Sequence, residues 1–224
     1  ILILLGHHKK NYFLKTFVIL INKKFKTLKD LNSRIFEEIL SLIEVKKSSH
    51  LILSGGNSPR YLFESIAQNK KYFNEATFLM SDERVVDIED PSSNEGEFIR
   101  LSNISNDNLI SLRDKEIIQK LNNISSYEIA ILGMGEDGHF ASIFPDCINT
   151  SSALNSQNKI VSFEDKHLDY PRISLSLNEI LKAEKIILIA SSKRKQSILR
   201  DQKDLPIHHL LQRSSNKLSI FNCD

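Results

Sequence analysis

The chain has 224 residues, of which 41% are hydrophobic and 26% charged, and its formal net charge is +2. A chain of this length and composition can bury a full core, which excludes disordered proteins and small scaffolds held by disulfides. The basic residues are scattered, so we expect no nucleic acid partner, and no run of 18 apolar residues predicts a membrane span.

The cysteines and histidines show no metal-binding pattern. Cys147 and Cys223 lack metal or redox spacing, so we expect free thiols in a reducing compartment and therefore a cytoplasmic protein. The histidine pairs at 7–8 and 208–209 have no partners at ligand spacing. We predict no metal site.

The first residues permit two interpretations. Residues 7–21 place basic residues before an apolar stretch, as a signal peptide does. Lys15 interrupts that stretch, however, and no small-residue cleavage site follows it. We therefore expect a first strand at Thr16–Ile21, a single domain over residues 16–224, and an unassigned segment at 1–15.

A glycine-rich turn follows the next strand. Apolar residues at helical spacing predict a helix over 28–45, followed by a strand at His50–Leu53. Helical periodicity resumes at Arg60–Ala67, with Pro59 suited to the first turn. A helix N-terminus has unpaired N–H groups, which suit a phosphate, although a simple tight turn explains the same pattern. The candidate phosphate ligands are Gly55, Gly56, Asn57 and Ser58.

A charged cluster follows the strand predicted at residues 76–81. Asp82, Glu83 and Arg84 bring two carboxylates and a guanidinium to that strand end, as a site or as a solvated cluster. The polar segment 85–97 is predicted to be a loop, and loops after strand ends often belong to sites. Phe98–Leu101 begins a predicted helix, 102–112 has no assignable pattern, and a short helix is predicted at Asp114–Leu121.

The most informative stretch is residues 127–145, YEIAILGMGEDGHFASIFP. Its apolar run, residues 129–132, predicts a buried strand that ends in a turn with three glycines. The turn carries Asp137 and His139, and a titratable imidazole beyond a strand end is a candidate base. We interpret the Ser142 hydroxyl as a helix-start group rather than a nucleophile.

The remaining segments continue the alternation of strands and helices. We predict an exposed loop at 146–158, strands at 159–163, 173–177, 185–190 and 217–221, a helix over 179–183 capped by Asn178, and helices at 196–200 and 206–211. This alternation predicts an α/β fold with a mainly parallel sheet and helices on both faces. Since parallel strands share one carboxyl edge, the polar turns could meet there, with Arg172 and Lys193 as cations for a phosphorylated substrate.

Several motifs resemble the 6-phosphogluconolactonase family and its wider glucosamine-6-phosphate isomerase/deaminase superfamily. They are LSGGNSP at 53–59, SDERVV and DPSSN within 81–94, and LGMGEDGHFASIFP at 132–145, with weaker matches at 171–176, 190–193 and 205–211. The resemblance implies a modified Rossmann-like three-layer sandwich. It also implies hydrolysis of 6-phospho-D-glucono-1,5-lactone to 6-phospho-D-gluconate in the oxidative pentose phosphate pathway, without cofactor or metal.

The same resemblance implies roles for individual residues. His139 corresponds to the general base, with Asp137 or Asp82 orienting that ring or the sugar hydroxyls. Arg84 corresponds to the group that polarises the lactone carbonyl. The 6-phosphate would lie in the turn of Gly55, Gly56, Asn57 and Ser58, with Arg172 and Lys193 as its cations. We expect a small phosphosugar lactone as the partner and a monomer, with the oligomeric state left open.

Three positions depart from the family pattern. The family usually has Ser-Thr where this chain has Asn57-Ser58, Thr where Phe140 stands, and Gly where Ala190 stands. None of these changes removes a group that the hydrolysis needs.

Two other functions are compatible with parts of this sequence. The deaminase branch typically has Tyr in place of Arg84 and an acidic residue in place of Phe144, and this chain has neither. A non-catalytic sugar-phosphate sensor would usually carry a DNA-binding segment, and the sequence has no basic helix for one.

Overall fold

The computed structural model describes residues 21–44, 49–200 and 204–223. Its centre is a sheet of seven strands in the order β1-β10-β9-β6-β2-β3-β5, and all neighbouring strands in it are parallel. The strands are β1 (Ile21–Phe25), β2 (Ser49–Leu53), β3 (Ala76–Met80), β5 (Leu109–Ile110), β6 (Tyr127–Gly133), β9 (Ala183–Ile189) and β10 (Leu218–Cys223). The prediction of a mainly parallel sheet is confirmed.

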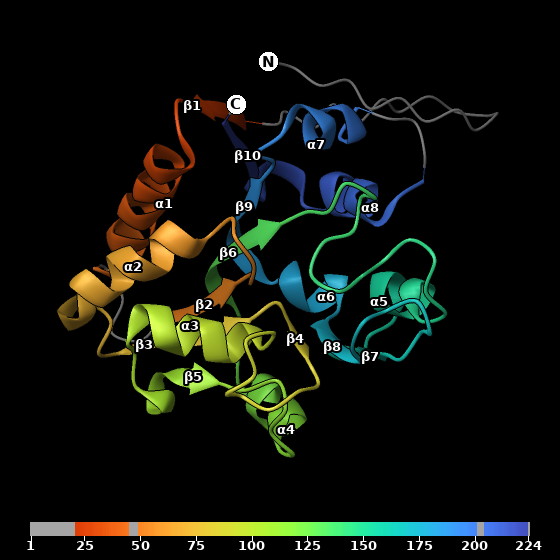
Figure 1. Cartoon of the computed structure of the whole chain (residues 1–224), viewed down its shortest axis with the longest axis horizontal. Coiled ribbons are helices and arrows are strands. Elements are labelled where there is room, and N and C mark those ends of the chain that lie inside the picture. The colour runs from red at the N-terminus through yellow and green to blue at the C-terminus, as the bar shows by residue number, and fades with distance from the viewer. Residues whose placement is uncertain (1–20, 45–48, 201–203, 224) are drawn as a thin grey trace.

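Helices cover both faces of this sheet, as predicted (Figure 1). One face packs against α1 (Leu28–Ile43), α2 (Arg60–Gln68) and α3 (Asn94–Ser102). The other packs against α4 (Ile117–Asn122), α5 (Thr150–Asn155), α6 (Leu177–Ile180) and α8 (Pro206–Arg213). Between β9 and α8 lies α7 (Lys193–Ile198), and three short 3-10 helices span Lys70–Tyr72, Asn106–Asn108 and Ser215–Lys217.

Strand β6 shows how one apolar run supplies two cores. Successive side chains of a strand point to opposite faces of the sheet. Ile129 and Ile131 therefore belong to the core under α1–α3, whereas Ala130 and Leu132 belong to the opposite core. All four residues are fully buried, which explains why the run is continuously apolar rather than alternating.

A second, smaller sheet lies beside the first and was not predicted. It consists of β4 (Asp82–Arg84), β8 (Arg172–Leu175) and β7 (Ile160–Phe163), in the order β4-β8-β7 with antiparallel pairing. The strand that we expected at 173–177 thus begins at Arg172 and does not join the parallel sheet. Its partner β4 is only three residues long and charged, so it gives no apolar pattern that could have revealed the pairing.

Two predicted loops contain helices. Helix α3 begins at Asn94 inside the segment expected to be a loop, because the Ser93 side chain accepts a hydrogen bond from the Gly96 N–H and caps it. Helix α5 lies within the expected loop 146–158 and buries Ala153 and Leu154. Its first turn has no side-chain cap, so local sequence gave little signal for it.

One predicted helix start is displaced, and another is confirmed. Helix α6 begins at Leu177 and is capped by Ser176, whose side chain accepts from the Glu179 N–H, rather than by Asn178. Helix α2 begins at Arg60, as predicted, with Pro59 as its N-cap rather than in its first turn. Of the first strand predicted at Thr16–Ile21, only Ile21 lies within the described residues, where it begins β1.

A buried carboxylate fastens α1 to the sheet. Glu38 is 7% exposed and accepts hydrogen bonds from Lys23 of β1, Arg34 of its own helix and Lys185 of β9. Burial alone would raise the pKa of Glu38, but these three cations outweigh it and lower the pKa to about 2. No helix within the described residues is long and apolar enough to cross a membrane.

Candidate active site

The predicted polar turns meet at the carboxyl edge of the parallel sheet. Strands β9, β6, β2 and β3 are successive neighbours, so the segments that follow them emerge side by side. The Ser54 N–H donates to Ile131 O at 2.9 Å, and the Ser81 N–H donates to Leu53 O at 2.7 Å. The prediction that the turns after β2 and β6 share one edge is confirmed.

His139 and Asp137 form a hydrogen-bonded pair in the turn after β6. The distance from His139 Nδ1 to Asp137 Oδ1 is 2.7 Å, and the same oxygen accepts the His139 backbone N–H at 3.1 Å. Burial would raise the pKa of Asp137, but the hydrogen bond and charge of His139 lower it below its ordinary value. The carboxylate on the imidazole is therefore that of Asp137, which decides between the two candidates for that contact.

Glycines let the imidazole fold back over its own turn. A Cβ at Gly135 would lie 2.3 Å from His139 Cε1 and Nδ1 and 2.4 Å from Asp137 Oδ1. Gly138 has φ of +84°, a conformation that residues with a side chain rarely adopt. The glycine spacing of the motif thus creates the space in which the pair lies.

Asp82 makes a different contact. Its carboxylate is 6% exposed and accepts hydrogen bonds from Ser142 Oγ at 2.6 Å and Ser81 Oγ at 3.0 Å. Ser142 is fully buried in a tight turn in which Ala141 has φ of +48°. The interpretation of Ser142 as a helix-start group was wrong, because its hydroxyl is bound to a carboxylate 60 residues earlier.

Arg84 and Arg172 are cross-strand partners in the small sheet. They are paired in register on β4 and β8, so their side chains start from one face of that sheet. Burial, with the neighbouring charge of Arg84, lowers the pKa of Arg172. Among the described residues, the Nε–H group of each arginine is buried without a hydrogen-bond partner. Two adjacent guanidinium groups with unused donors are suited to binding an anion.

Asn94 belongs to this group, although its sequence context did not mark it as a site residue. Its side-chain oxygen accepts from Arg84 Nη1 at 2.6 Å, and its Nδ2 donates to Asp82 O at 2.8 Å. A Cβ at Gly55 would lie 2.0 Å from the same oxygen. The DPSSN motif contained Asn94, but its role depends on contacts with two distant segments.

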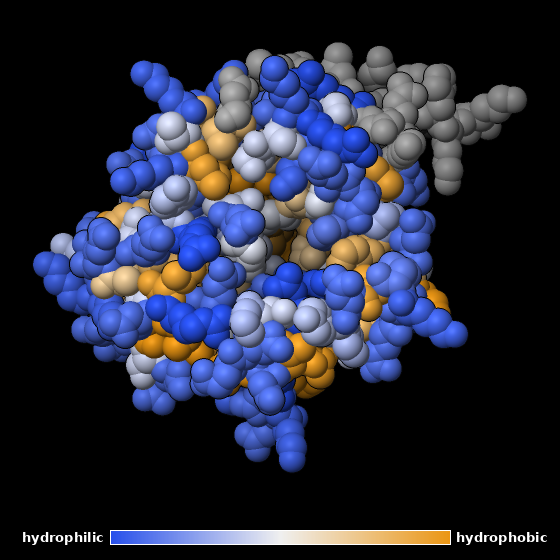
Figure 2. Space-filling model, in the orientation of Figure 1, coloured by the Kyte–Doolittle hydropathy of each residue, from blue (hydrophilic) through white to orange (hydrophobic). Residues whose placement is uncertain are grey.

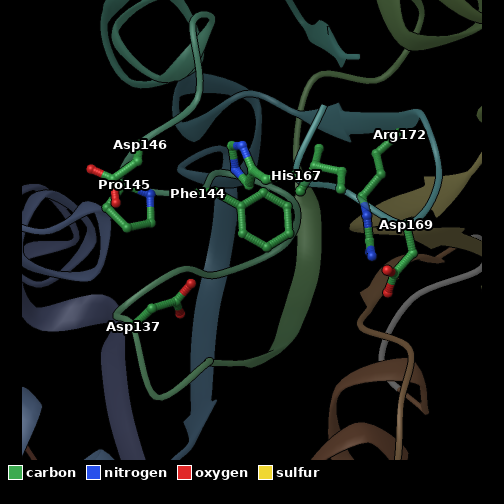
Figure 3. A pocket seen from close by; sticks show the side chains of 8 residues that line it. Asp137, Phe144, Pro145, Asp146, His167, Asp169 and Arg172 are labelled. Carbon is green, nitrogen blue, oxygen red and sulfur yellow. The ribbon is translucent and has the colours of Figure 1, made fainter. Parts of the chain in front are cut away.

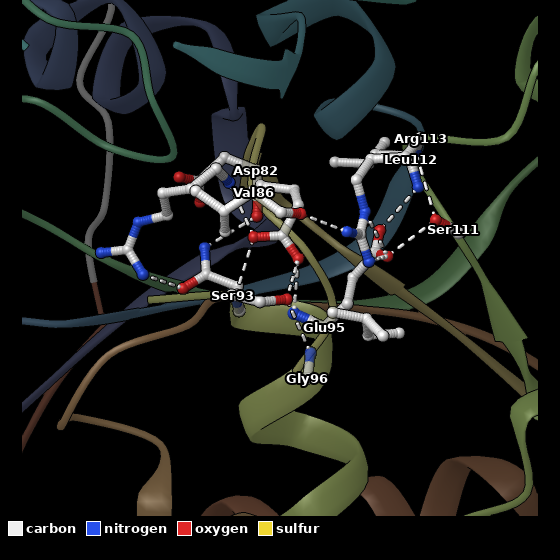
Figure 4. Close-up of polar contacts among 12 residues, drawn as sticks. Asp82, Val86, Ser93, Glu95, Gly96, Ser111, Leu112 and Arg113 are labelled. Carbon is white, nitrogen blue, oxygen red and sulfur yellow. Dashed lines mark hydrogen bonds and ion pairs between the residues drawn. The ribbon is translucent and has the colours of Figure 1, made fainter. Parts of the chain in front are cut away.

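Buried carboxylates hold the loop that carries Asn94. Glu83 accepts the N–H groups of Asn94 and Glu95 at 2.8 and 2.7 Å, at the N-terminus of α3. Burial raises the pKa of Glu83, against the lowering effect of these donors. Glu95 in turn accepts from Ser111, Leu112 and Arg113 (Figure 4). Asn94, which binds Arg84, is thus held in place by Glu83, and the neighbouring Glu95 is anchored to residues 111–113.

The candidate phosphate turn lies between β2 and α2. Gly56 has φ of +79°, and nothing lies within 4 Å of the position that a Cβ would take there. Asn57 and Ser58 follow, and Ser58 O accepts from Asn32 Nδ2 of α1 at 2.9 Å. The turn therefore leaves space beside Gly56 and is hydrogen-bonded to α1 at Ser58.

Lys193 lies at the periphery. It is the first residue of α7, four residues after β9 ends, and its side chain is exposed. No hydrogen bond or ion pair between described residues joins it to the other candidate residues. Its neighbour Arg194 forms an ion pair with Glu136 of the His139 turn, with 3.2 Å from Nε to Oε2.

A pocket of about 300 Å³ adjoins the His139–Asp137 pair. It is lined by Asp137, Phe144, Pro145, Asp146, His167, Leu168, Asp169 and Arg172 (Figure 3). The Phe144 ring lies 4.4 Å from the His139 ring, between centroids, and the Arg172 guanidinium carbon lies 5.4 Å from the Phe144 centroid. The Phe144 ring thus lies close to both the His139 imidazole and the Arg172 guanidinium. Figure 2 shows the surface hollowed near the middle of this face, over the end of β6 in Figure 1.

No metal centre is evident at this edge. Throughout the described ranges, no group of three or more histidine, cysteine, aspartate or glutamate side chains is placed to hold a metal ion. Cys147 and Cys223 are not joined by a disulfide, and both are buried. Burial, with the hydrogen bond and charge of Asp165, raises the pKa of the Cys147 thiol to about 11. Neither cysteine therefore resembles a nucleophile.

Comparison with known proteins gives consistent results. The family model for glucosamine-6-phosphate isomerases/6-phosphogluconolactonase matches residues 22–219. A 6-phosphogluconolactonase of Helicobacter pylori is 27% identical over 88% of this chain and 96% of its own length. A putative 6-phosphogluconolactonase of Caenorhabditis elegans is 30% identical over 73% of this chain and 69% of its own.

The fold is shared with solved structures of the same description. The crystal structure of a 6-phosphogluconolactonase from Shewanella baltica superimposes with a TM-score of 0.82 at 24% identity. The match covers 92% of this chain and 98% of the other. The chain therefore belongs to the glucosamine-6-phosphate isomerase/6-phosphogluconolactonase family.

Proposed function

We propose that this protein hydrolyses 6-phospho-D-glucono-1,5-lactone to 6-phospho-D-gluconate, the lactonase step of the oxidative pentose phosphate pathway. The relatives described as 6-phosphogluconolactonases support this reaction. The observation that carries the proposal is the His139–Asp137 pair beside two adjacent arginines. It combines a base for activating water with cations for a phosphorylated substrate.

His139 is proposed as the general base. Because Asp137 accepts a hydrogen bond from Nδ1–H, the lone pair of the neutral ring is on Nε2. That nitrogen takes a proton from water as the water oxygen attacks the lactone carbonyl. The ring C–O bond then breaks, and the imidazolium returns its proton to the departing alkoxide. The new carboxylic acid ionises, so each turnover releases one proton to the solvent.

The arginines and the glycine-rich turn are proposed to bind the charged groups. We assign Arg84 to the carbonyl oxygen, where positive charge stabilises the oxyanion that forms during attack. We assign the 6-phosphate to Arg172 and the turn Gly55–Ser58, with Lys193 adding charge from α7. The buried, unused Nε–H groups of Arg84 and Arg172, within the part that the structure describes, support this assignment.

The deaminase branch of the family is the alternative. In that branch an acidic residue typically stands where this chain has Phe144. Here an aromatic ring lies 4.4 Å from the imidazole at that position, so the ring of His139 has an apolar surface beside it in place of a second carboxylate. This contact favours lactone hydrolysis.

The test is to assay the purified protein for both reactions. Lactone opening is followed by proton release, after subtraction of the uncatalysed rate, and deamination by ammonia release from glucosamine 6-phosphate. We expect proton release to be accelerated and ammonia to be absent. Ammonia release without faster lactone opening would reverse the assignment to the deaminase branch.

A matched pair of variants tests the base. His139→Ala should lower kcat by about 10²–10⁴-fold while phosphosugar binding is kept. His209→Ala is the control, because His209 also pairs with an aspartate, Asp204, at 3.1 Å and has a side chain 27% exposed, against 30% for His139. If His139→Ala turned over at a near-normal rate, the base would be another group.

A further inference from the structure

A buried polar contact joins the turn of His139 to the small sheet that carries both arginines. Ser142 lies three residues after His139 and donates from Oγ to Asp82 Oδ2 at 2.6 Å. Its backbone N–H donates to Ser174 Oγ at 3.2 Å. Asp82 and Ser174 are themselves cross-strand partners on β4 and β8. Ser142 is thus docked onto a single residue pair of the small sheet.

The position of this contact relates it to the proposed chemistry. Arg84 lies two residues after Asp82 on β4, and Arg172 lies two residues before Ser174 on β8. Because strand residues two apart project from the same face, Ser142 is anchored beside the arginine pair. Any shift of Ser142 against the small sheet would change the separation between His139 and both arginines.

The turn around Ser142 is held in an unfavourable backbone conformation. Ala141 has φ of +48°, and the Ile143 N–H closes the turn on Phe140 O at 3.0 Å. A residue with a side chain persists in the left-handed region only where its surroundings impose it. Phe140 and Ile143 are fully buried. Ser142, which lies between them in the sequence, binds Asp82 of the small sheet through its hydroxyl. Loss of the Oγ hydrogen bond would leave only the weaker 3.2 Å contact of the Ser142 N–H between this turn and the residue pair of the small sheet, and the turn could then shift together with His139.

We propose that the Asp82–Ser142 hydrogen bond is a positioning contact that fixes His139 relative to the Arg84–Arg172 pair, and that Asp82 acts through Ser142 without touching the substrate. The proposal rests on the function proposed above. It assigns a role to a buried carboxylate that the hydrolysis itself does not use. It also distinguishes Asp82 from Asp137, which contacts the imidazole directly.

Two serine variants separate positioning from general stability. Ser81 and Ser142 are both fully buried, and each donates from Oγ to one oxygen of Asp82. Only Ser142 belongs to the turn of His139. We expect Ser142→Ala to lower kcat by about 10- to 100-fold, because displacements near 1 Å can cost that much, with KM changed less than about threefold. Ser81→Ala should leave both constants within about threefold.

Two substitutions of Asp82 separate position from charge. Asp82→Asn keeps an oxygen that can accept from Ser142, while its amide N–H can donate to Ser81 Oγ. We therefore expect Asp82→Asn to retain kcat within about fivefold and Asp82→Ala to lose as much as Ser142→Ala. The double variant Asp82→Ala/Ser142→Ala should be no slower than either single variant, since both remove one contact. Equal losses in Asp82→Asn and Asp82→Ala would show that the charge matters, and would refute the proposal.

A spectroscopic measurement tests the proposal independently of turnover. The imidazole ¹⁵N and ¹H resonances of His139 are identified by their loss in His139→Ala. They should shift in Ser142→Ala and remain unchanged in Ser81→Ala. Unchanged His139 resonances in Ser142→Ala would overturn the positioning role even if the wild-type protein proved inactive on the lactone. Equal kcat losses in the two serine variants would also overturn it. Absence of lactonase activity in the wild type would instead contradict the proposed function.

Discussion

Gly135→Ala is the sharpest test of the geometry around the candidate base. The new Cβ would lie 2.3 Å from two atoms of the His139 ring and 2.4 Å from Asp137 Oδ1. Carbon and nitrogen atoms that are not bonded approach no closer than about 3.4 Å without strain. Both members of the pair must therefore move by about 1 Å to accommodate one methyl group.

The cost should fall on catalysis rather than on folding. A misplacement of 1 Å can lower a rate by about 10²-fold, which corresponds to about 3 kcal/mol in the activation free energy. Gly135 is not among the residues with positive φ, so alanine can adopt its backbone conformation. The exposed fractions of the His139 and Asp137 side chains, 30% and 47%, leave room for both to swing outward. We expect the melting temperature to change little.

Gly133→Ala is the matched control. It introduces the same methyl group two residues earlier, where the nearest atom, Ser54 Oγ, would be 3.6 Å away, an ordinary van der Waals contact. The assay is steady-state proton release from the lactone, together with thermal unfolding of both variants. A Gly135→Ala enzyme with kcat within threefold of the wild type would show that the observed ring position is not the working one. An equal loss in Gly133→Ala would show that the effect is general to the turn.

Two further predictions concern binding and stability. Arg172→Ala should raise KM by at least tenfold with a smaller effect on kcat, and Lys193→Ala should raise KM less because the Lys193 side chain is exposed. Steady-state kinetics measure both variants. A larger rise in KM for Lys193→Ala would make Lys193 the main phosphate cation. Glu38→Gln should lower the free energy of unfolding by about 2 kcal/mol at pH 7, after allowance for partial solvent screening. Since the pKa of Glu38 is lowered from 4.5 to about 2, this difference should disappear as the pH falls through that range, and a difference constant with pH in urea unfolding would contradict the ion-pair explanation.

The parts of the fold that the sequence predicted are those with a local signal. The apolar run of β6 and the glycines after it mark a strand end whatever the rest of the chain does, and the same holds for β2 and its turn. Because a parallel sheet gathers such ends, their convergence could be predicted without knowing the strand order. The pairing of His139 with Asp137 is also local, since the two residues are only two positions apart, although the sequence left Asp82 open as the alternative partner.

What could not be predicted depends on contacts between distant segments. Strand β4 is recognisable only through its pairing with β8, about 90 residues later. Three charged residues in a row are equally typical of an exposed loop. The role of Asn94 arises because Gly55 leaves space for its side chain and Arg84 binds it. A serine after a glycine turn commonly caps a helix. The hydroxyl of Ser142 instead donates to Asp82, a carboxylate of the small sheet that the local sequence does not reveal.

The two sheets together explain why this site can be formed before substrate binds. The proposed base, His139, follows a strand of the parallel sheet, whereas Arg84 and Arg172 lie on the antiparallel sheet, so no strand pairing sets the distance between them. Ser81 alone separates the end of β3 from the start of β4, and its carbonyl accepts the Leu175 N–H at 2.9 Å, which fixes one side of the junction. The other side is fixed where Ser142 meets Asp82. With both sides held by short, buried contacts, substrate binding has little rearrangement to drive, so loosening either contact should slow the chemical step more than it weakens binding.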